Sequence, residues 1–152
     1  MPVRNLLYVC TGNVFRSPVA EEITKQLLED SKMKMDVESA GLLKYNGEPI
    51  REQVLNLTEK YRINLHHHKP RQVNKGLIKK ADLILVFENS QVKELEEKFP
   101  QAKNKTYTIK GYVGQANYDV EDLRGKPIEA FEEFLKETKI DIKKCLDRMS
   151  GR

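Results

Sequence analysis

The sequence contains no long hydrophobic run. No apolar stretch approaches the roughly 20 residues that a helix needs to cross a bilayer. Residues 1–5 lead into only four apolar residues, 6–9, which is too short a run for the core of a secretory signal peptide. We therefore expect a cytoplasmic protein with no membrane partner.

Cysteine is also scarce. The chain has two cysteines, Cys10 and Cys145, which cannot build a disulfide framework and form no Cys-x-x-Cys pair of the kind that binds zinc. We expect both to be free thiols. The run His66-His67-His68 is the other candidate for a metal site, but consecutive side chains point in different directions and no acidic or cysteine partner stands at ligand spacing. We predict no bound metal.

Length and charge narrow the class of protein further. The 152 residues are the usual size of one domain, which we place at 1–152. Lys plus Arg number 27 against 23 Asp plus Glu, a net charge of +4, which favours anionic partners such as phosphates. The basic residues are scattered rather than gathered in a stripe, so we expect no nucleic-acid partner.

Short apolar runs alternate with stretches of helical periodicity. Strands are predicted at 6–9, ending at Cys10, and at 35–41, 83–87 and 107–109. Helices are predicted from Ser17 as N-cap with Pro18 at the first helical position, and over 49–61, 92–99 and 128–149. This order indicates a single-domain α/β fold, Rossmann-like or flavodoxin-like, with a four-stranded parallel sheet and helices on both faces.

Ligands of such sheets bind beyond the carboxyl ends of the strands, so the residues after Cys10 are the place to look for a site. Cys10 and Arg16 are separated by five residues there. Backbone N–H groups of residues 11–16 can form an anion nest, to which the amino end of the next helix adds positive potential. Arg16 can bind two phosphate oxygens, and Cys10 would be held as a thiolate, ready for in-line attack on phosphorus. Gly12 and Asn13 tolerate the left-handed backbone that a tight cradle needs.

The alternative is that Cys10 is a small buried residue at a strand end, the commonest role of a free cysteine. The cradle interpretation is favoured because Gly12-Asn13 lies inside the loop and Ser17-Pro18 follows Arg16 directly.

Residues 9–18, Val-Cys-Thr-Gly-Asn-Val-Phe-Arg-Ser-Pro, resemble the signature of the low-molecular-weight protein tyrosine phosphatases. Residues 39–41, 68–73 and 82–88 are similar to other segments of that family, so the likeness covers nearly the whole chain. The resemblance implies a fold of the phosphotyrosine phosphatase I type. It also implies a cofactor-free phosphomonoester hydrolase that acts on phosphotyrosine, in a protein or an aryl phosphate, through a phosphocysteine.

By this resemblance Cys10 is the nucleophile and Arg16 binds the phosphate. Ser17 would donate a hydrogen bond to the thiolate. Asn13, Ser39 and His68 would form the network that holds the loop in shape. The remaining residues of the phosphate-binding loop would be Thr11, Gly12, Val14 and Phe15.

A proton donor is expected late in the chain, because expelling a phenolate benefits from a general acid. Asp119, Glu121 and Asp122 compete for this role. The register Asp-Val-x-Asp puts Asp122 at the position of the family's donor. Leu123 stands where the family has proline, which suggests a more mobile acid, and Arg124 stands where it usually has an aromatic wall.

Two further departures from the family's pattern, and one aromatic residue, bear on the choice of substrate and on the redox behaviour of Cys10. Phe15 occupies the position of a second, protective cysteine in many members. Val14 stands where the branch active on phosphoarginine has Thr, which favours phosphotyrosine. Tyr45 is a candidate aromatic wall for a phenyl ring, although a surface aromatic is an equal alternative.

Three other activities remain open: phosphoarginine hydrolysis, arsenate reduction, and phosphate or phosphotyrosine binding with weakened catalysis. Arsenate reduction needs two further cysteines to relay a disulfide, whereas residues 81–90 contain none and Cys145 is expected to face the core. Leu123 and Arg124 motivate the binding-protein alternative.

Overall fold

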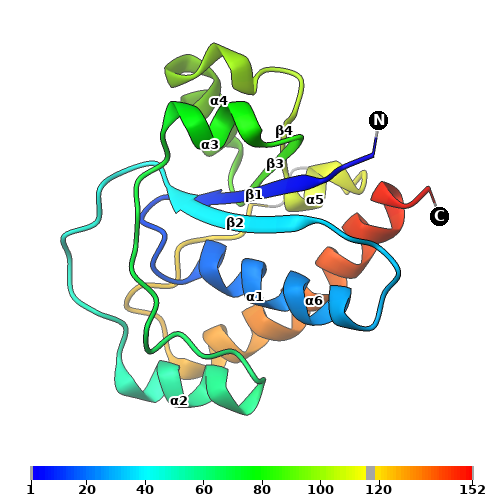
Figure 1. The fold of residues 1–152 in the computed structure, drawn as a ribbon. Coiled ribbons are helices and arrows are strands. Elements are labelled where there is room, and N and C mark those ends of the chain that lie inside the picture. The colour runs from blue at the N-terminus through cyan, green and yellow to red at the C-terminus, as the bar shows by residue number, and fades with distance from the viewer. Residues whose placement is uncertain (1, 116–118, 152) are drawn as a thin grey trace.

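The computed structural model describes residues 2–115 and 119–151, so the end residues of the predicted domain 1–152 lie outside the described residues. A four-stranded parallel sheet with helices on both faces confirms the predicted fold class (Figure 1). Its strand order is β2-β1-β3-β4. The strands are β1 (Asn5–Cys10), β2 (Asp36–Gly41), β3 (Leu83–Val86) and β4 (Thr106–Thr108). The α-helices are α1 (Arg16–Glu29), α2 (Glu52–Lys60), α3 (Lys75–Lys80), α4 (Asn89–Lys98), α5 (Ile109–Tyr112) and α6 (Ile128–Met149), and a 3₁₀ turn, η1, spans Pro100–Ala102.

The side chains of β1 alternate between two hydrophobic cores. Leu6, Tyr8 and Cys10 belong to the core that includes α1 and α6, and Leu7 and Val9 belong to the one that includes α3 and α4. Figure 1 shows these helix pairs on opposite sides of the sheet. Because a parallel strand of this kind is buried on both faces, its sequence is apolar throughout rather than alternating. The thiol of Cys10 therefore points to the α1 side.

The connections that leave β1 and β3 lead to opposite edges of the sheet. From β1 it passes through α1 to β2 at one edge, and from β3 it passes through α4 to β4 at the other. The segments that follow β1 and β3 separate at their carboxyl ends, which is where ligands bind in doubly wound sheets. Residues 11–15 and Glu88 lie at this point.

Several element boundaries differ from the predicted ones. The first helix begins at Arg16 with Phe15 as N-cap, and the Ser17 side chain does not cap it but bonds within the loop that precedes the helix. Strand β4 ends at Thr108, because the Thr108 hydroxyl accepts a hydrogen bond from Gly111 N at 2.8 Å and so starts α5. Helix α2 begins at Glu52 rather than at residue 49. The short helices α3 and α5 were not predicted.

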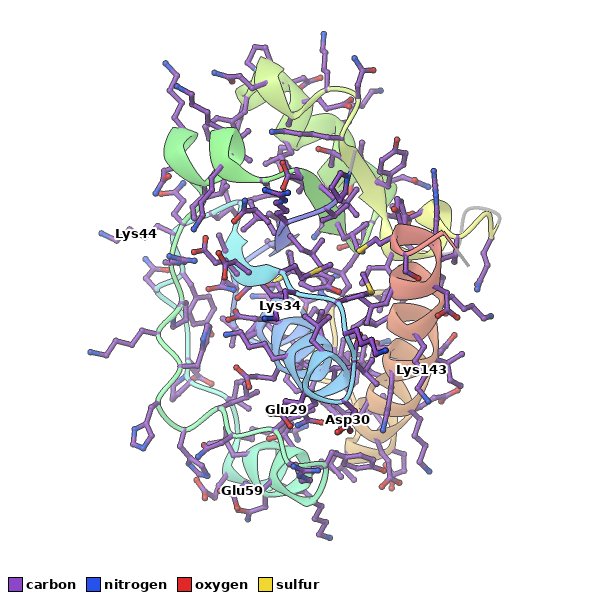
Figure 2. All side chains as sticks on the ribbon, turned by 45° about the vertical axis from the view of Figure 1, so that its right-hand side comes forward. Glu29, Asp30, Lys34, Lys44, Glu59 and Lys143 are labelled. Atoms are coloured by element: carbon purple, nitrogen blue, oxygen red, sulfur yellow. The ribbon has the colours of Figure 1, made fainter. Side chains whose placement is uncertain are left out.

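Charged side chains cover the outside of the molecule. Figure 2 shows Lys44 extending outward from the segment after β2 and Glu59 on α2, and both are exposed. No helix built from residues 2–115 or 119–151 is long and apolar enough to cross a membrane.

Candidate active site

Cys10 is the last residue of β1, and its thiol lies at the base of the loop 11–15. Cys10 Sγ is 3.0 Å from Ser17 Oγ and accepts a hydrogen bond from Asn13 N at 3.2 Å. The side chain is buried, with 3% of its surface exposed. A hydroxyl and an amide N–H that converge on one sulfur are suited to a thiolate, which accepts hydrogen bonds more strongly than a thiol.

Asn13 organises this loop from a fully buried position. Its φ of 56° lies in the left-handed region, where Asn is one of the few tolerated side chains. Asn13 Nδ2 donates to Ser17 Oγ at 2.8 Å and to Ser39 Oγ at 3.0 Å. His68 Nε2 lies 2.7 Å from Asn13 O. The structure therefore brings together Asn13, Ser39 and His68, the three residues for which the sequence predicts a supporting network, and it places the side chain of Ser17 among them.

Two residues that the sequence analysis did not identify extend this network. Glu21 Oε1 accepts a hydrogen bond from Ser39 Oγ at 2.6 Å. The Arg71 backbone N–H donates to Asn13 Oδ1 at 3.1 Å, and Arg71 Nε donates to Ser39 O at 3.0 Å. Glu21 lies one helical turn after Ser17 on α1, and that spacing is the signal from which it could have been found.

Gly41 ends β2 directly beside the loop. A Cβ atom at Gly41 would lie 2.8 Å from the Gly12 carbonyl carbon and 2.9 Å from Asn13 N. The absence of a side chain therefore lets β2 approach the loop backbone this closely.

Arg16 is the first residue of α1 and is only 4% exposed. Its Nη1 donates to Glu88 Oε2 at 2.8 Å and to Val120 O at 2.6 Å. Gln91 Nε2 donates to Glu88 Oε2 at 3.2 Å and to Thr11 Oγ1 at 3.1 Å. No sequence pattern assigns a role to Glu88 or Gln91. The signal for Glu88 was its place just after a buried strand, because the carboxyl ends of parallel strands meet at one edge of the sheet.

Phe15 attaches the loop to the last helix. Its ring centroid lies 5.1 Å from that of Phe131 and 5.3 Å from that of Phe134. An aromatic cluster of this kind stabilises the loop through burial and edge-to-face contact. Phe15 thus packs in the core, although it also borders the cleft described next.

A cleft of about 650 Å³ opens above the thiol. Tyr45 and Asp122, predicted as substrate wall and proton donor, both border it together with Cys10. The Tyr45 ring lies against the loop, since a Cβ on Gly12 would be 3.0 Å from Tyr45 Cδ1, and the Tyr45 hydroxyl donates to the carbonyl of Glu48. The other predicted phosphate-loop residues that line the cleft are Thr11, Gly12, Val14, Phe15 and Arg16.

The three candidate proton donors have different surroundings. Asp119 Oδ1 accepts a hydrogen bond from Asn89 N, the first residue of α4, at 2.9 Å. Glu121 points to solvent, 3.9 Å from Lys126 Nζ. Asp122 is the one among the lining residues of the cleft. The surroundings therefore favour Asp122 as donor and Asp119 as an anchor of the loop.

Asp122 is bound by its near neighbour Arg124. Oδ2 accepts from Arg124 Nε at 2.7 Å, and Oδ1 accepts from Arg124 N at 3.1 Å. Burial raises the pKa of Asp122, but the hydrogen bonds and charge of Arg124, together with the charge of Arg16, outweigh it and hold the pKa below its usual value.

The remaining histidines and the second cysteine lie apart from the cleft. His66 Nε2 is 2.6 Å from Glu59 Oε1, whereas His68 faces Asn13, so the histidine run does not converge on one point. Both cysteines are free, and Cys145 is buried in the core as predicted, with Sγ 3.6 Å from Ile109 O.

Comparisons with known proteins agree with this arrangement. The family described as "Low molecular weight phosphotyrosine protein phosphatase" matches residues 5–151. The chain is 32% identical over 146 residues to the low molecular weight protein-tyrosine-phosphatase Ptp of Acinetobacter johnsonii, covering 96% of this chain and 95% of that one. It is 30% identical over 153 residues to the protein-arginine-phosphatase of Geobacillus stearothermophilus, covering 100% and 97% of the two chains. A solved low molecular weight protein tyrosine phosphatase from T. tengcongensis has a TM-score of 0.86 at 31% identity, covering 95% of this chain and 99% of that chain. The chain therefore belongs to the low molecular weight phosphotyrosine protein phosphatase family.

Proposed function

We propose that this protein removes phosphate from phosphotyrosine, in a protein or a small aryl phosphate, through a phosphocysteine at Cys10. We further propose that residues 1–152 are one phosphatase domain and that it acts in the cytoplasm. The observation that carries the proposal is the convergence of Asn13 N and Ser17 Oγ on the Cys10 sulfur. That sulfur lies beneath a loop with Arg16 at its helical end.

The first chemical step forms the phosphocysteine. The Cys10 thiolate attacks phosphorus, the S–P bond forms and the P–O bond to the aryl group breaks. The leaving oxygen takes a proton from Asp122. Two N–H groups of Arg16 Nη1 are held by Glu88 and Val120, and the guanidinium would use the N–H groups on Nε and Nη2 to bind two phosphate oxygens.

The second step returns the enzyme to its starting state. Water attacks phosphorus, and the Asp122 carboxylate takes a proton from the attacking water. The S–P bond breaks, and inorganic phosphate and the Cys10 thiolate are released. The same carboxyl group thus gives a proton in one step and takes one in the next.

Replacement of the thiol tests this proposal. Cys10→Ser should abolish turnover of p-nitrophenyl phosphate while vanadate or phosphate still binds, because the loop donors remain and the nucleophile is lost. Cys145→Ala is the matched control, since it removes the chain's other cysteine from the core and should leave turnover in place. Ordinary activity in Cys10→Ser would refute the mechanism. A wild-type protein that binds vanadate and turns over no aryl phosphate would instead be a binding protein.

Phosphoarginine hydrolysis is the second candidate function. It is favoured by the 30% identity to a protein-arginine-phosphatase. Val14 borders the cleft with an apolar side chain, and Tyr45 offers a ring surface beside it, which suits a phenyl group better than a guanidinium. Two peptides of one sequence, carrying phosphotyrosine or phosphoarginine, would separate the candidates: we expect the higher kcat/KM for phosphotyrosine.

A further inference from the structure

Arg124 and Asp122 form a two-point contact at the cleft. One oxygen of the carboxylate accepts from the Arg124 side chain at 2.7 Å and the other from its backbone N–H at 3.1 Å. The two residues are two positions apart in one loop. Both border the cleft above Cys10.

This contact stabilises the ionised form of Asp122, which cannot act as a proton donor. A group that gives a proton to the leaving oxygen must first carry one. A guanidinium has donors and no acceptor, so its contact with Asp122 favours the ionised carboxylate over the acid. Bound phosphate acts in the opposite direction, because its negative charge favours protonation of Asp122 and offers Arg124 another acceptor.

We propose that Arg124 is a positioning residue for Asp122, one that holds the resting carboxylate at the cleft and sets the pH range over which Asp122 can donate a proton. The inference rests on the proposed phosphatase function. Leu123, between the two residues, packs against the core that contains α1 and α6. The packing of Leu123 holds the loop in place, and the side chains of Asp122 and Arg124 on either side of it pair at the cleft.

Other charged and titratable groups face Asp122 from the segments around it. Arg16 contributes from the start of α1, and the Cys10 thiol from the end of β1. Within the loop, Glu121 lies 3.9 Å from Lys126 Nζ. Segment 44–51, which also lines the cleft, carries Lys44, Tyr45, Glu48 and Arg51, and the Arg51 side chain donates to Lys126 O at 3.0 Å. Among these cations, Arg124 is the one whose side chain donates to the carboxylate of Asp122.

A carbon-13 NMR titration of the Asp122 carboxyl in the full chain tests the proposal directly. Arg124→Met should raise the pKa of Asp122 by roughly half a unit to one unit, less than for a buried pair, because the side chains are 72% and 38% exposed. Arg124→Lys should give an intermediate value, since an ammonium keeps the charge and loses the fixed geometry. Arg124 is exposed, so these variants should fold like the wild type.

Lys126→Met is the matched control, because it removes one positive charge from the same loop at a residue that pairs with Glu121 instead. Its Asp122 pKa should equal that of the wild type. An unchanged pKa in Arg124→Met would overturn the proposal. So would an equal rise in both methionine variants, because the cause would then be net charge.

A kinetic readout separates positioning from a merely structural role. In single-turnover experiments with phenyl phosphate and excess enzyme, the alkaline limb of the rate should move to higher pH in Arg124→Met. A structural role would instead lower the rate at every pH without moving the limb. The NMR titration needs no turnover, so failure of this inference is distinguishable from failure of the proposed function, which Cys10→Ser tests.

Discussion

Arg16 donates from Nη1 to Glu88 Oε2 at 2.8 Å, so Glu88, two residues after the end of β3, orients the guanidinium that begins α1. Gln91 links this pair to the loop, because it donates both to Glu88 and to Thr11. The phosphate-binding loop is therefore supported from the carboxyl ends of two adjacent strands.

We expect Glu88→Gln to lower kcat/KM for p-nitrophenyl phosphate by roughly tenfold to a hundredfold, because a shift of about 1 Å in a positioning group has costs of this size. The change removes the charge that holds Arg16 and keeps the size of the side chain. Steady-state kinetics checks this, with Glu94→Gln as the control on the exposed face of α4. A Glu88→Gln enzyme as active as that control would show that Arg16 does not depend on the ion pair.

Asp122→Asn should lower turnover of phenyl phosphate by roughly 10²–10⁴-fold, the usual effect of losing a positioned acid. The loss in the first step should be smaller with p-nitrophenyl phosphate, because its leaving group needs little protonation. Single-turnover rates for the two substrates give this comparison.

Asp119→Asn and Glu121→Gln are the controls for Asp122. An asparagine at 119 keeps the oxygen that accepts from Asn89 N, and Glu121 points to solvent, so both variants should change the rate only slightly. If Asp119→Asn were the variant that loses turnover, Asp119 and not Asp122 would be the proton donor.

Peroxide should inactivate the enzyme without joining its two cysteines. Burial, together with the charge of Asp141, raises the pKa of Cys145 to about 12, so this thiol is not a ready nucleophile for an oxidised Cys10. Phe15 cannot supply a sulfur either. We expect phosphate to protect, and tryptic mapping to show Cys10 in its irreversible oxidation states. A Cys10–Cys145 disulfide peptide would contradict the core position of Cys145.

The fold could be predicted well where burial determines the sequence pattern. The runs 6–9 and 83–86 are apolar because their strands are covered on both faces, and the helix 128–149 has the bounds that its periodicity predicts. Helices α3 and α5 were missed because they have six and four residues, too few for a periodic signal. Their starts depend on local caps from Asn74 and Thr108.

The site was predictable where its residues are contiguous in the chain. Cys10, Asn13 and Arg16 fall within one loop and its flanks, so spacing alone brings them together. The two residues that accept from Arg16 Nη1, Glu88 and Val120, are 72 and 104 positions away, and no local pattern pairs them with Arg16. The contact between Asp122 and Arg124 was missed for another reason: the sequence shows the two residues and not the turn that folds one onto the other.

The most direct test of the account is the site of covalent phosphorylation during turnover. Wild-type enzyme would be mixed with p-nitrophenyl phosphate, quenched in acid within the first turnovers, digested with trypsin and analysed by mass spectrometry. The account predicts one phosphoryl group on peptide 5–16, located at Cys10. Steady turnover with that peptide unmodified and the phosphoryl group on another residue would contradict it.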